Sequence, residues 1–227
     1  MPTKLKRIID EITPPIILRG VNAVLGPSGG NHGHPEPSGQ KDASWYDASF
    51  DANDAWRSHY SESEYYFLWT VIADRIERAK IESILEIGCG PTQLACLLKD
   101  KGIRKYHGFD FSARRIEQAK QVCPEFKFSL QDAFQTDLFT TVDYDAVICT
   151  EFLEHVEKDI EALKRIRSGA RFYGTVPNFP FTSHVRHFGS EDEVRSRYSR
   201  CFSDLRVDVF LANVNGKAFY LLEGEIA

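Results

Sequence analysis

The sequence lacks a basic excess, a paired-cysteine motif and a long apolar run. Its 227 residues include 28 Lys and Arg against 33 Asp and Glu, a net charge of −5, which argues against a protein built mainly to bind polyanions. Five cysteines without a Cys-x-x-Cys pair argue against a disulfide framework or zinc knot and favour a reducing compartment. No apolar run approaches the ~20 residues that span a bilayer, and the N-terminus does not read as a signal peptide. We therefore expect a cytoplasmic protein.

The composition changes near residue 60. Residues 26–40 are rich in Gly, Pro and Ser and cannot bury a core, so they predict a flexible loop. Aromatic residues return over 44–60, which either close over a ligand as a lid or only pack on the main domain. We expect residues 1–60 to form an N-terminal extension and residues 61–227 the main domain.

From residue 81 onward, apolar runs alternate with helical patterns. The predicted strands are 84–87, 106–109, 126–130, 146–149 and 171–176, and the predicted helices between and after them are 92–101, 112–122 and 158–167. This alternation predicts a parallel sheet with helices on both faces. Residues 205–211 and 217–223, with an Asn215-Gly216 turn between them, predict an antiparallel finish. The expected fold class is α/β, a doubly wound, seven-stranded, mostly parallel sheet with an antiparallel C-terminal strand. A further helix is predicted from a Ser61/Glu64 capping box.

The first strand of this pattern ends in a glycine turn, Gly88-Cys89-Gly90, and a helix follows. Glycines allow a sharp turn and a close approach to a ligand, and free amides at a helix start favour an anionic group. Gly-x-Gly alone fits a plain strand-to-helix turn equally well. Asp110 ends the second strand, about 20 residues after Gly90, the spacing at which an acid meets ribose hydroxyls in nucleotide sites. Asp132 ends the third strand, where it can accept a hydrogen bond from an adenine amino group, although either acid can instead cap its own loop.

The runs ILEIGCG, YHGFDFSARRIEQAK, LQDAF and YDAVICTEFLEHVEKDIEALKRI, in this order, resemble the successive motifs of class I S-adenosylmethionine-dependent methyltransferases. The resemblance covers roughly residues 80–190 and is closest to members with an E-H-V motif after the fourth strand and a V-P-N motif after the fifth. It implies a Rossmann-like methyltransferase fold with S-adenosyl-L-methionine as cofactor. By this resemblance the methionine part lies among Glu86, Gly88 and Gly90, the ribose at Asp110, and the adenine at Asp132 and Ala133.

Two other classes of protein remain open at this point. An NAD-dependent oxidoreductase would use G-x-G-x-x-G, but the sixth position is Gln93. A non-catalytic nucleotide-binding protein would bind the cofactor without turnover. Against both, we expect methyl transfer to a small molecule or glycan, most simply at oxygen, with no nucleic acid partner. Lys4, Lys6 and Arg7 could touch a membrane surface, although a helix docked on the domain is the simpler interpretation.

Methyl transfer to a hydroxyl needs alignment along the S–CH₃ axis and a base. Glu151 and His155 follow the fourth strand and share a face if the turn there is helical, so they are the candidate catalytic residues. Small-RNA 2′-O-methyltransferases use a similar E-x-x-E-H arrangement and a later His to bind a metal. Glu154 and either His184 or His187 could complete that set, but we expect no required metal and His155 to shape the pocket floor.

Overall fold

The structure, a computed structural model, describes residues 39–212 and 216–227. The predicted loop up to residue 38, the basic residues Lys4, Lys6 and Arg7, and Asn215 of the predicted turn lie outside the described residues. Within those two ranges, no helix is long and apolar enough to cross a membrane.

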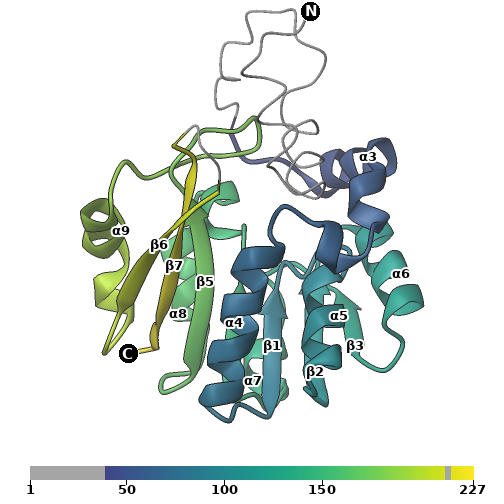
Figure 1. Cartoon of the computed structure of the whole chain (residues 1–227), viewed down its shortest axis with the longest axis horizontal. Helices are drawn as coiled ribbons and strands as arrows, with labels where there is room; N and C mark the ends of the chain where they lie inside the picture. Colours follow the sequence, from purple (N-terminus) through teal and green to yellow (C-terminus); the bar gives the residue numbers. More distant parts are fainter. Residues whose placement is uncertain (1–38, 213–215) are drawn as a thin grey trace, which may run out of the picture. The chain divides into compact units, whose positions relative to one another are not determined.

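Seven strands form one sheet in the order β3-β2-β1-β4-β5-β7-β6 (Figure 1). Their bounds are β1 Ser83–Ile87, β2 Lys105–Asp110, β3 Lys127–Leu130, β4 Ala146–Cys149, β5 Arg171–Pro177, β6 Arg206–Leu211 and β7 Ala218–Glu225. The pairs among β1 to β5 are parallel, whereas β7 runs antiparallel to both β5 and β6. The expected fold class is confirmed, because the strand order reverses beside β1 and one antiparallel strand closes the pattern.

Each face of the sheet buries its own apolar cluster. On one face, α4 (Tyr66–Arg78), α5 (Gln93–Asp100) and α6 (Ala113–Val122) pack against residues such as Ile84 and Ile148. On the other face, α7 (Leu138–Thr141), α8 (Asp159–Lys164) and α9 (Glu191–Tyr198) pack against residues such as Leu85 and Val147. Adjacent residues of β1 and β4 thus point to opposite clusters, as strand geometry requires. Helices on both faces explain why every residue of these two central strands is buried.

The segment before the sheet differs from the sequence prediction. Residues Ala43–Ala52 form a helix, α3, whose N-cap Asp42 accepts the Trp45 N–H at 3.0 Å. Short 3₁₀ turns follow at Asp54–Arg57 (η1) and Tyr60–Glu62 (η2). The predicted capping box at Ser61 and Glu64 does not form, because the Ser61 hydroxyl is bonded to His59 Nδ1 at 2.7 Å. Helix α4 begins only at Tyr66, without a side-chain cap.

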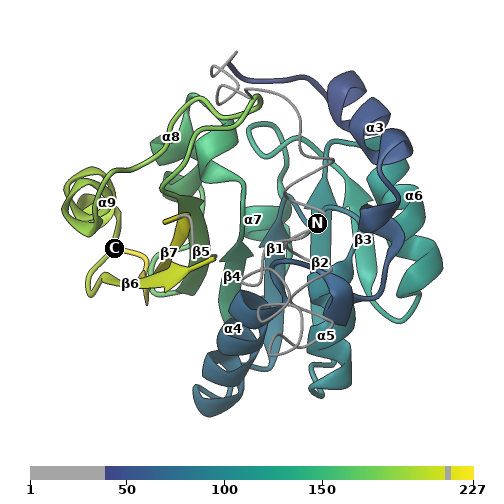
Figure 2. The same cartoon turned by 45° about the horizontal axis from the view of Figure 1, so that its top comes forward.

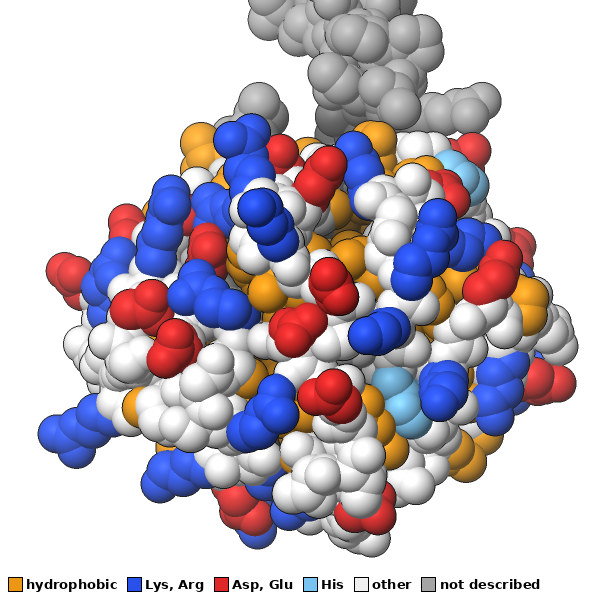
Figure 3. All heavy atoms as spheres, turned by 90° about the horizontal axis from the view of Figure 1, so that it is seen from below, with side chains coloured by type: hydrophobic (Ala, Val, Ile, Leu, Met, Phe, Trp, Pro, Cys, Tyr) orange, Lys and Arg blue, Asp and Glu red, His pale blue; other side chains and the backbone are white. Residues whose placement is uncertain are grey.

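The face of the molecule seen from below carries charges of both signs. Lys and Arg side chains alternate with Asp and Glu over this face, without a large area of one sign (Figure 3). A mixed surface of this kind provides no electrostatic track for a nucleic acid backbone. It agrees with the net charge of −5 for the whole sequence.

Candidate active site

A cavity lies beyond the carboxyl ends of β1, β2, β3 and β4, where ligands bind in open α/β sheets. The residues that line it come from the loops after these strands and from the segment before the sheet: Gln40, Lys41, Tyr46, Gly88, Phe109, Asp110, Phe111, Arg115, Gln131, Asp132, Ala133, Phe134, Glu151, Phe152, His155 and Val156. Six residues predicted from the sequence therefore share one cavity: Gly88, Asp110, Asp132, Ala133, Glu151 and His155.

The turn after β1 depends on backbone that favours glycine. Gly88 and Gly90 have φ angles of 66° and 55°, and Thr92 follows at 85°. A Cβ on Gly88 would lie 2.9 Å from the Phe152 ring, so only glycine fits there without displacing the loop after β4. The Gly88 backbone consequently forms part of the cavity wall between the loops after β2 and β4.

Asp110 connects this turn to the start of α6. Its Oδ2 accepts the Gly90 N–H at 3.1 Å and its Oδ1 accepts the Ser112 N–H at 2.8 Å. Burial raises the pKa of Asp110, an effect that the nearby Arg115 guanidinium and these N–H donors oppose. Each carboxylate oxygen accepts more than one hydrogen bond, so Asp110 can hold the loops together and still accept ribose hydroxyls.

Asp132 caps its own loop and also lines the cavity, while its contact with an adenine stays a prediction. Its Oδ1 accepts the Phe134 N–H at 2.7 Å, which closes the loop after β3, and the residue also lines the cavity beside Ala133. The capping bond thus directs the carboxylate toward the place where the motif resemblance positions an adenine.

Glu86 does not lie among the described residues that line the cavity. Leu85 and Ile87 point into one cluster, so the two-residue period of β1 turns Glu86 to the other face. There its carboxylate accepts the hydroxyl hydrogen of Tyr106, and burial raises the pKa of Glu86 to about 8. Glu86 is therefore buried beside Tyr106, and the contacts of Glu86, Gly88 and Gly90 with the methionine part of the cofactor stay predictions.

The loop after β4 presents Glu151 to the cavity. Glu151 has a left-handed backbone, with φ of 50°. The Thr175 hydroxyl accepts the Glu151 N–H at 3.0 Å and donates to its Oε1 at 2.9 Å, so one side chain fixes both backbone and carboxylate. Burial raises the pKa of Glu151 to about 7. A carboxyl group with this pKa can exchange a proton near neutral pH.

The loop after β5 brings a second histidine beside His155. Val185 N–H donates to Glu154 O at 2.8 Å, and the Arg186 guanidinium donates to Val156 O at 2.5 Å, which joins the two loops. The rings of His155 and His184 lie 4.8 Å apart. His187 is exposed, so of the two histidines proposed from the sequence, only His184 joins this group.

Both histidines present an unprotonated nitrogen. Their Nδ1–H groups donate to backbone carbonyls, His155 to Ser183 at 2.9 Å and His184 to Phe179 at 3.1 Å. Burial lowers the pKa of His155 to about 3 and that of His184 to about 4. Glu154 is fully buried, and its Oε1 lies 3.7 Å from His155 Nε2. Its carboxylate oxygens have no hydrogen-bond partner within residues 39–212 and 216–227. One ligand atom from each of Glu154, His155 and His184 lies within 4.8 Å of the others.

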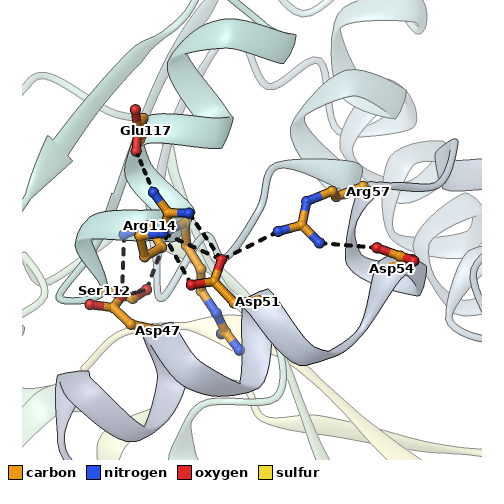
Figure 4. Close-up of polar contacts among 8 residues, drawn as sticks. Asp47, Asp51, Asp54, Arg57, Ser112, Arg114 and Glu117 are labelled. Carbon is orange, nitrogen blue, oxygen red and sulfur yellow. Dashed lines mark hydrogen bonds and ion pairs between the residues drawn. The ribbon is translucent and has the colours of Figure 1, made fainter.

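Helix α3 covers the cavity and was not predicted as a helix. Its Tyr46 ring lies 5.3 Å from Phe111, after β2, and 6.0 Å from His155, after β4. Figure 2 shows α3 alongside α6. Asp47 accepts the Ser112 hydroxyl at 2.5 Å, and Asp51 pairs with Arg114 at 3.1 Å (Figure 4). These contacts hold α3 against the helix that begins beside Asp110.

Gln93 anchors the same segment from the other side. Its Nε2 donates to Ala55 O at 3.2 Å and to Ser58 O at 2.9 Å. The position that a dinucleotide fingerprint reserves for glycine therefore carries a side chain that binds η1. This contact removes the close helix packing on which that fingerprint depends.

Comparisons with known proteins agree with this fold. Residues 84–171 match the family model described as a methyltransferase domain. No curated protein sequence matches the chain. Three solved structures illustrate the range of proteins with this fold. Their sequence identities to this chain are too low to infer its substrate from theirs.

The first is magnesium protoporphyrin IX methyltransferase from Synechocystis PCC 6803 with bound S-adenosylhomocysteine (17% identity, 82% of this chain, 98% of that chain, TM-score 0.61). The second is the N-methyltransferase NodS from Bradyrhizobium japonicum WM9, also with S-adenosylhomocysteine (14% identity, 82% of this chain, 99% of that chain, TM-score 0.62). The third is the N-terminal domain of EvdMO1 in the presence of S-adenosylhomocysteine and D-fucose (15% identity, 68% of this chain, 82% of that chain, TM-score 0.54).

Proposed function

We propose that the protein transfers the methyl group of S-adenosylmethionine to a hydroxyl oxygen of a small molecule or glycan, because residues 84–171 match a methyltransferase domain and the fold is shared with methyltransferases that hold S-adenosylhomocysteine. One observation carries the choice of oxygen. Glu151 and His155 lie on the wall of the same cavity as Gly88, Asp110 and Asp132. The proposal replaces the NAD-dependent oxidoreductase, to which neither the family model nor Gln93 gives support.

In this proposal Glu151 is the general base. A hydroxyl acceptor loses its proton as the new O–CH₃ bond forms and the S–CH₃ bond breaks, leaving S-adenosylhomocysteine. The Glu151 carboxylate takes that proton, and its pKa of about 7 suits a base at neutral pH. Thr175 holds the carboxylate in place, which reduces the motion required at the moment of transfer.

His155 is proposed to orient the acceptor. Its Nδ1–H is committed to the Ser183 carbonyl, so its Nε2 accepts a hydrogen bond. A pKa lowered to about 3 keeps the ring neutral, which makes it a weak base but a suitable acceptor for a second hydroxyl. The proposal thus gives Glu151 the proton transfer and His155 the alignment.

A small molecule or glycan is favoured over nucleic acid as the methyl acceptor. The sequence is acidic, with a net charge of −5, which disfavours binding to a polyanion, and the face drawn in Figure 3 carries charges of both signs. Among the structures with this fold, EvdMO1 was crystallised in the presence of D-fucose, a sugar. Action in the cytoplasm is part of the same proposal.

The test is methyl transfer from labelled S-adenosylmethionine to fractionated small molecules and glycans, with the labelled product identified by mass spectrometry. We expect a methyl ether whose formation stops in Glu151→Gln. A product labelled on nitrogen or carbon, formed equally well by Glu151→Gln, would overturn the choice of oxygen. Binding of S-adenosylhomocysteine without any labelled product would instead support the non-catalytic alternative.

A second candidate function is metal-assisted methylation, including methylation of an RNA 2′-hydroxyl. The observation that favours it is the group Glu154, His155 and His184. Two neutral histidines with their Nδ1–H groups on carbonyls lie beside a carboxylate that has no hydrogen-bond partner among the described residues, and the three groups fit the ligands of a divalent cation. Such an ion would lower the pKa of a hydroxyl acceptor, whereas in the leading proposal Glu151 removes the proton as a general base.

Chelation followed by desalting separates the two candidates. The leading proposal expects full activity after chelation and little change in His184→Gln. Loss of activity on chelation, restored by Mg²⁺ or Mn²⁺ in the wild type but not in His184→Gln, would establish the metal-assisted function instead. His187→Gln is the matched control, because His187 is exposed and lies outside the group.

A further inference from the structure

One charged side chain in the cavity has no ion-pair or hydrogen-bond partner for its guanidinium among the described residues. Arg115, in the first turn of α6, lines the cavity with Gly88 and Asp110. It forms no ion pair within the described residues, and its buried Nε has no hydrogen-bond acceptor there. The neighbouring Arg114, in contrast, pairs with Asp51 and Glu117. A guanidinium group with free donors inside a cavity is suited to an anionic group of a ligand.

The surroundings hold this guanidinium in place without using its donors. Its central carbon lies 4.8 Å from the Tyr46 ring centre and 5.4 Å from that of Trp56. Aromatic faces attract a cation through the ring, and they leave the N–H groups free for other partners. The Nη1 atom lies 4.0 Å from the position that a Cβ on Gly90 would take. Arg115 therefore reaches back from α6 to the turn after β1.

The charges of the cofactor indicate which anion belongs there. S-adenosylmethionine carries a sulfonium, an ammonium and one carboxylate. The acidic residues on the cavity wall suit its cationic groups and hydroxyls, but the carboxylate needs a cation. Of the described residues that line the cavity, only Lys41 and Arg115 carry a permanent positive charge, and Lys41 has an interaction of its own.

We propose that Arg115 binds the carboxylate of the cofactor's methionine part; this inference rests on the proposed function. Two parallel N–H···O bonds from the guanidinium would fix the amino acid end of the cofactor beside Gly90, while Asp110 fixes the ribose. Tyr46 and Trp56 come from the segment that covers the cavity, so they position Arg115 from above. The residue thereby connects that cover to the cofactor.

The experiment compares two ligands that differ in one charge. S-adenosylhomocysteine keeps the carboxylate, and its methyl ester removes the charge while leaving the rest of the molecule unchanged. Affinities for wild type, Arg115→Gln and Arg115→Lys are measured by calorimetry. We expect Arg115→Gln to weaken binding of S-adenosylhomocysteine roughly tenfold or more and to leave ester binding within about twofold. Arg115→Lys should lie between, since it keeps the charge but not the fork.

Lys120→Gln is the matched control, because it removes an exposed charge from the same helix. Equal losses for both ligands in Arg115→Gln would overturn the inference, since they would indicate a damaged fold or cover. Unchanged binding of S-adenosylhomocysteine would overturn it as well. If the wild type binds neither ligand, the proposed function fails and this inference fails with it. The two failures are therefore distinguishable.

Discussion

The two ends of the cavity are built on different physical principles. At the end near β2 and β3, the carboxylates of Asp110 and Asp132 accept backbone N–H groups, which fix their positions. At the end near β4 and β5, Glu154 is buried with no hydrogen-bond partner in the part of the chain that the structure describes, and burial keeps His155 neutral. The first end provides constant shape and charge, which suits a cofactor that is the same in every turnover. The second end holds groups that can gain or lose a proton, which suits an acceptor that must be deprotonated.

The largest expected effect breaks this comparison at the second end. Glu151→Gln keeps a side chain of the same size that still bonds to Thr175, but it cannot accept a proton. We expect methyl transfer to slow about 10²- to 10⁴-fold, with S-adenosylhomocysteine affinity within about twofold of wild type. Initial rates and calorimetry measure the two quantities. Glu161→Gln, an exposed change on α8, should leave both unchanged. A slowing below about tenfold would remove Glu151 from the chemistry.

The pH profile sharpens the same point. A general base works in its deprotonated form, and burial raises the pKa of Glu151 to about 7. The rate in wild type should therefore fall about tenfold per pH unit below about 7 and level off above it. Rates measured from pH 5.5 to 8.5 with saturating substrates test this expectation. If Glu151→Gln keeps the same slope, the titrating group lies elsewhere.

At the first end, the expected loss is one of binding rather than of rate. Asp110→Ala removes the ribose contact and two loop bonds, so we expect cofactor affinity to fall by about 1.5–3 kcal/mol. Calorimetry with S-adenosylhomocysteine gives this value, and Asp110→Asn should lose less. Asp143→Asn, at an exposed position, is the control. If Asp110→Ala bound S-adenosylhomocysteine as tightly as the wild type, the ribose would not be bound by Asp110.

Behind the first end, the burial of Glu86 makes the stability of the fold depend on pH. Its folded pKa, raised to about 8 by burial, exceeds the ordinary value of 4.5, so the folded state binds the proton more tightly. Its contribution is therefore present at low pH, and the free energy of unfolding falls as the pH rises toward 8. We expect Glu86→Gln to flatten this dependence, because a neutral amide still accepts the Tyr106 hydroxyl. Urea unfolding at pH 5.5 and 8.5 measures the free energy of unfolding of both proteins. An equal change between the two pH values in wild type and in Glu86→Gln would contradict the burial argument.

The smallest expected effect concerns the cover that both ends share. Tyr46 contacts residues after β2 and after β4, so we expect residues 42–60 to become better ordered when the cofactor binds. Hydrogen exchange should slow in this segment as well as around Gly88 and Asp110 on adding S-adenosylhomocysteine. If exchange slowed only around Gly88 and Asp110, residues 42–60 would pack on the domain without becoming better ordered when the cofactor binds. Asp51→Asn, which loosens an exposed ion pair worth less than about 1 kcal/mol, should reduce the added protection slightly.

The sequence predicted the sheet closely because each strand is a short apolar run between turn residues. The positions of Asp110 and Asp132 at the cavity could also be predicted. Asp110 ends one strand and Asp132 closely follows another, and the carboxyl ends of parallel strands meet at one edge of the sheet. Glu86 was assigned by motif resemblance, whereas the alternation Leu85-Glu86-Ile87 already places it on the opposite face.

The remaining parts of the site depend on contacts between distant segments. Tyr46 and Arg115 meet only because α3 packs on α6, and no local pattern encodes that docking. His184 reaches His155 through the bonds between the loops after β4 and β5. Thr175 lies inside β5, and nothing in this run of buried residues indicates that its hydroxyl binds Glu151. Such contacts are set by tertiary packing, which a single sequence does not display.

The backbone of Glu151 has a consequence for how this protein balances stability against activity. A residue other than glycine in the left-handed region costs about 1–2 kcal/mol, and here it also carries a buried carboxylate. Glu151→Gly would relieve the backbone and remove the carboxylate together. The proposed function then predicts a variant that unfolds at a higher temperature than the wild type and no longer transfers methyl groups. Selection for stability alone would consequently remove the residue on which turnover depends.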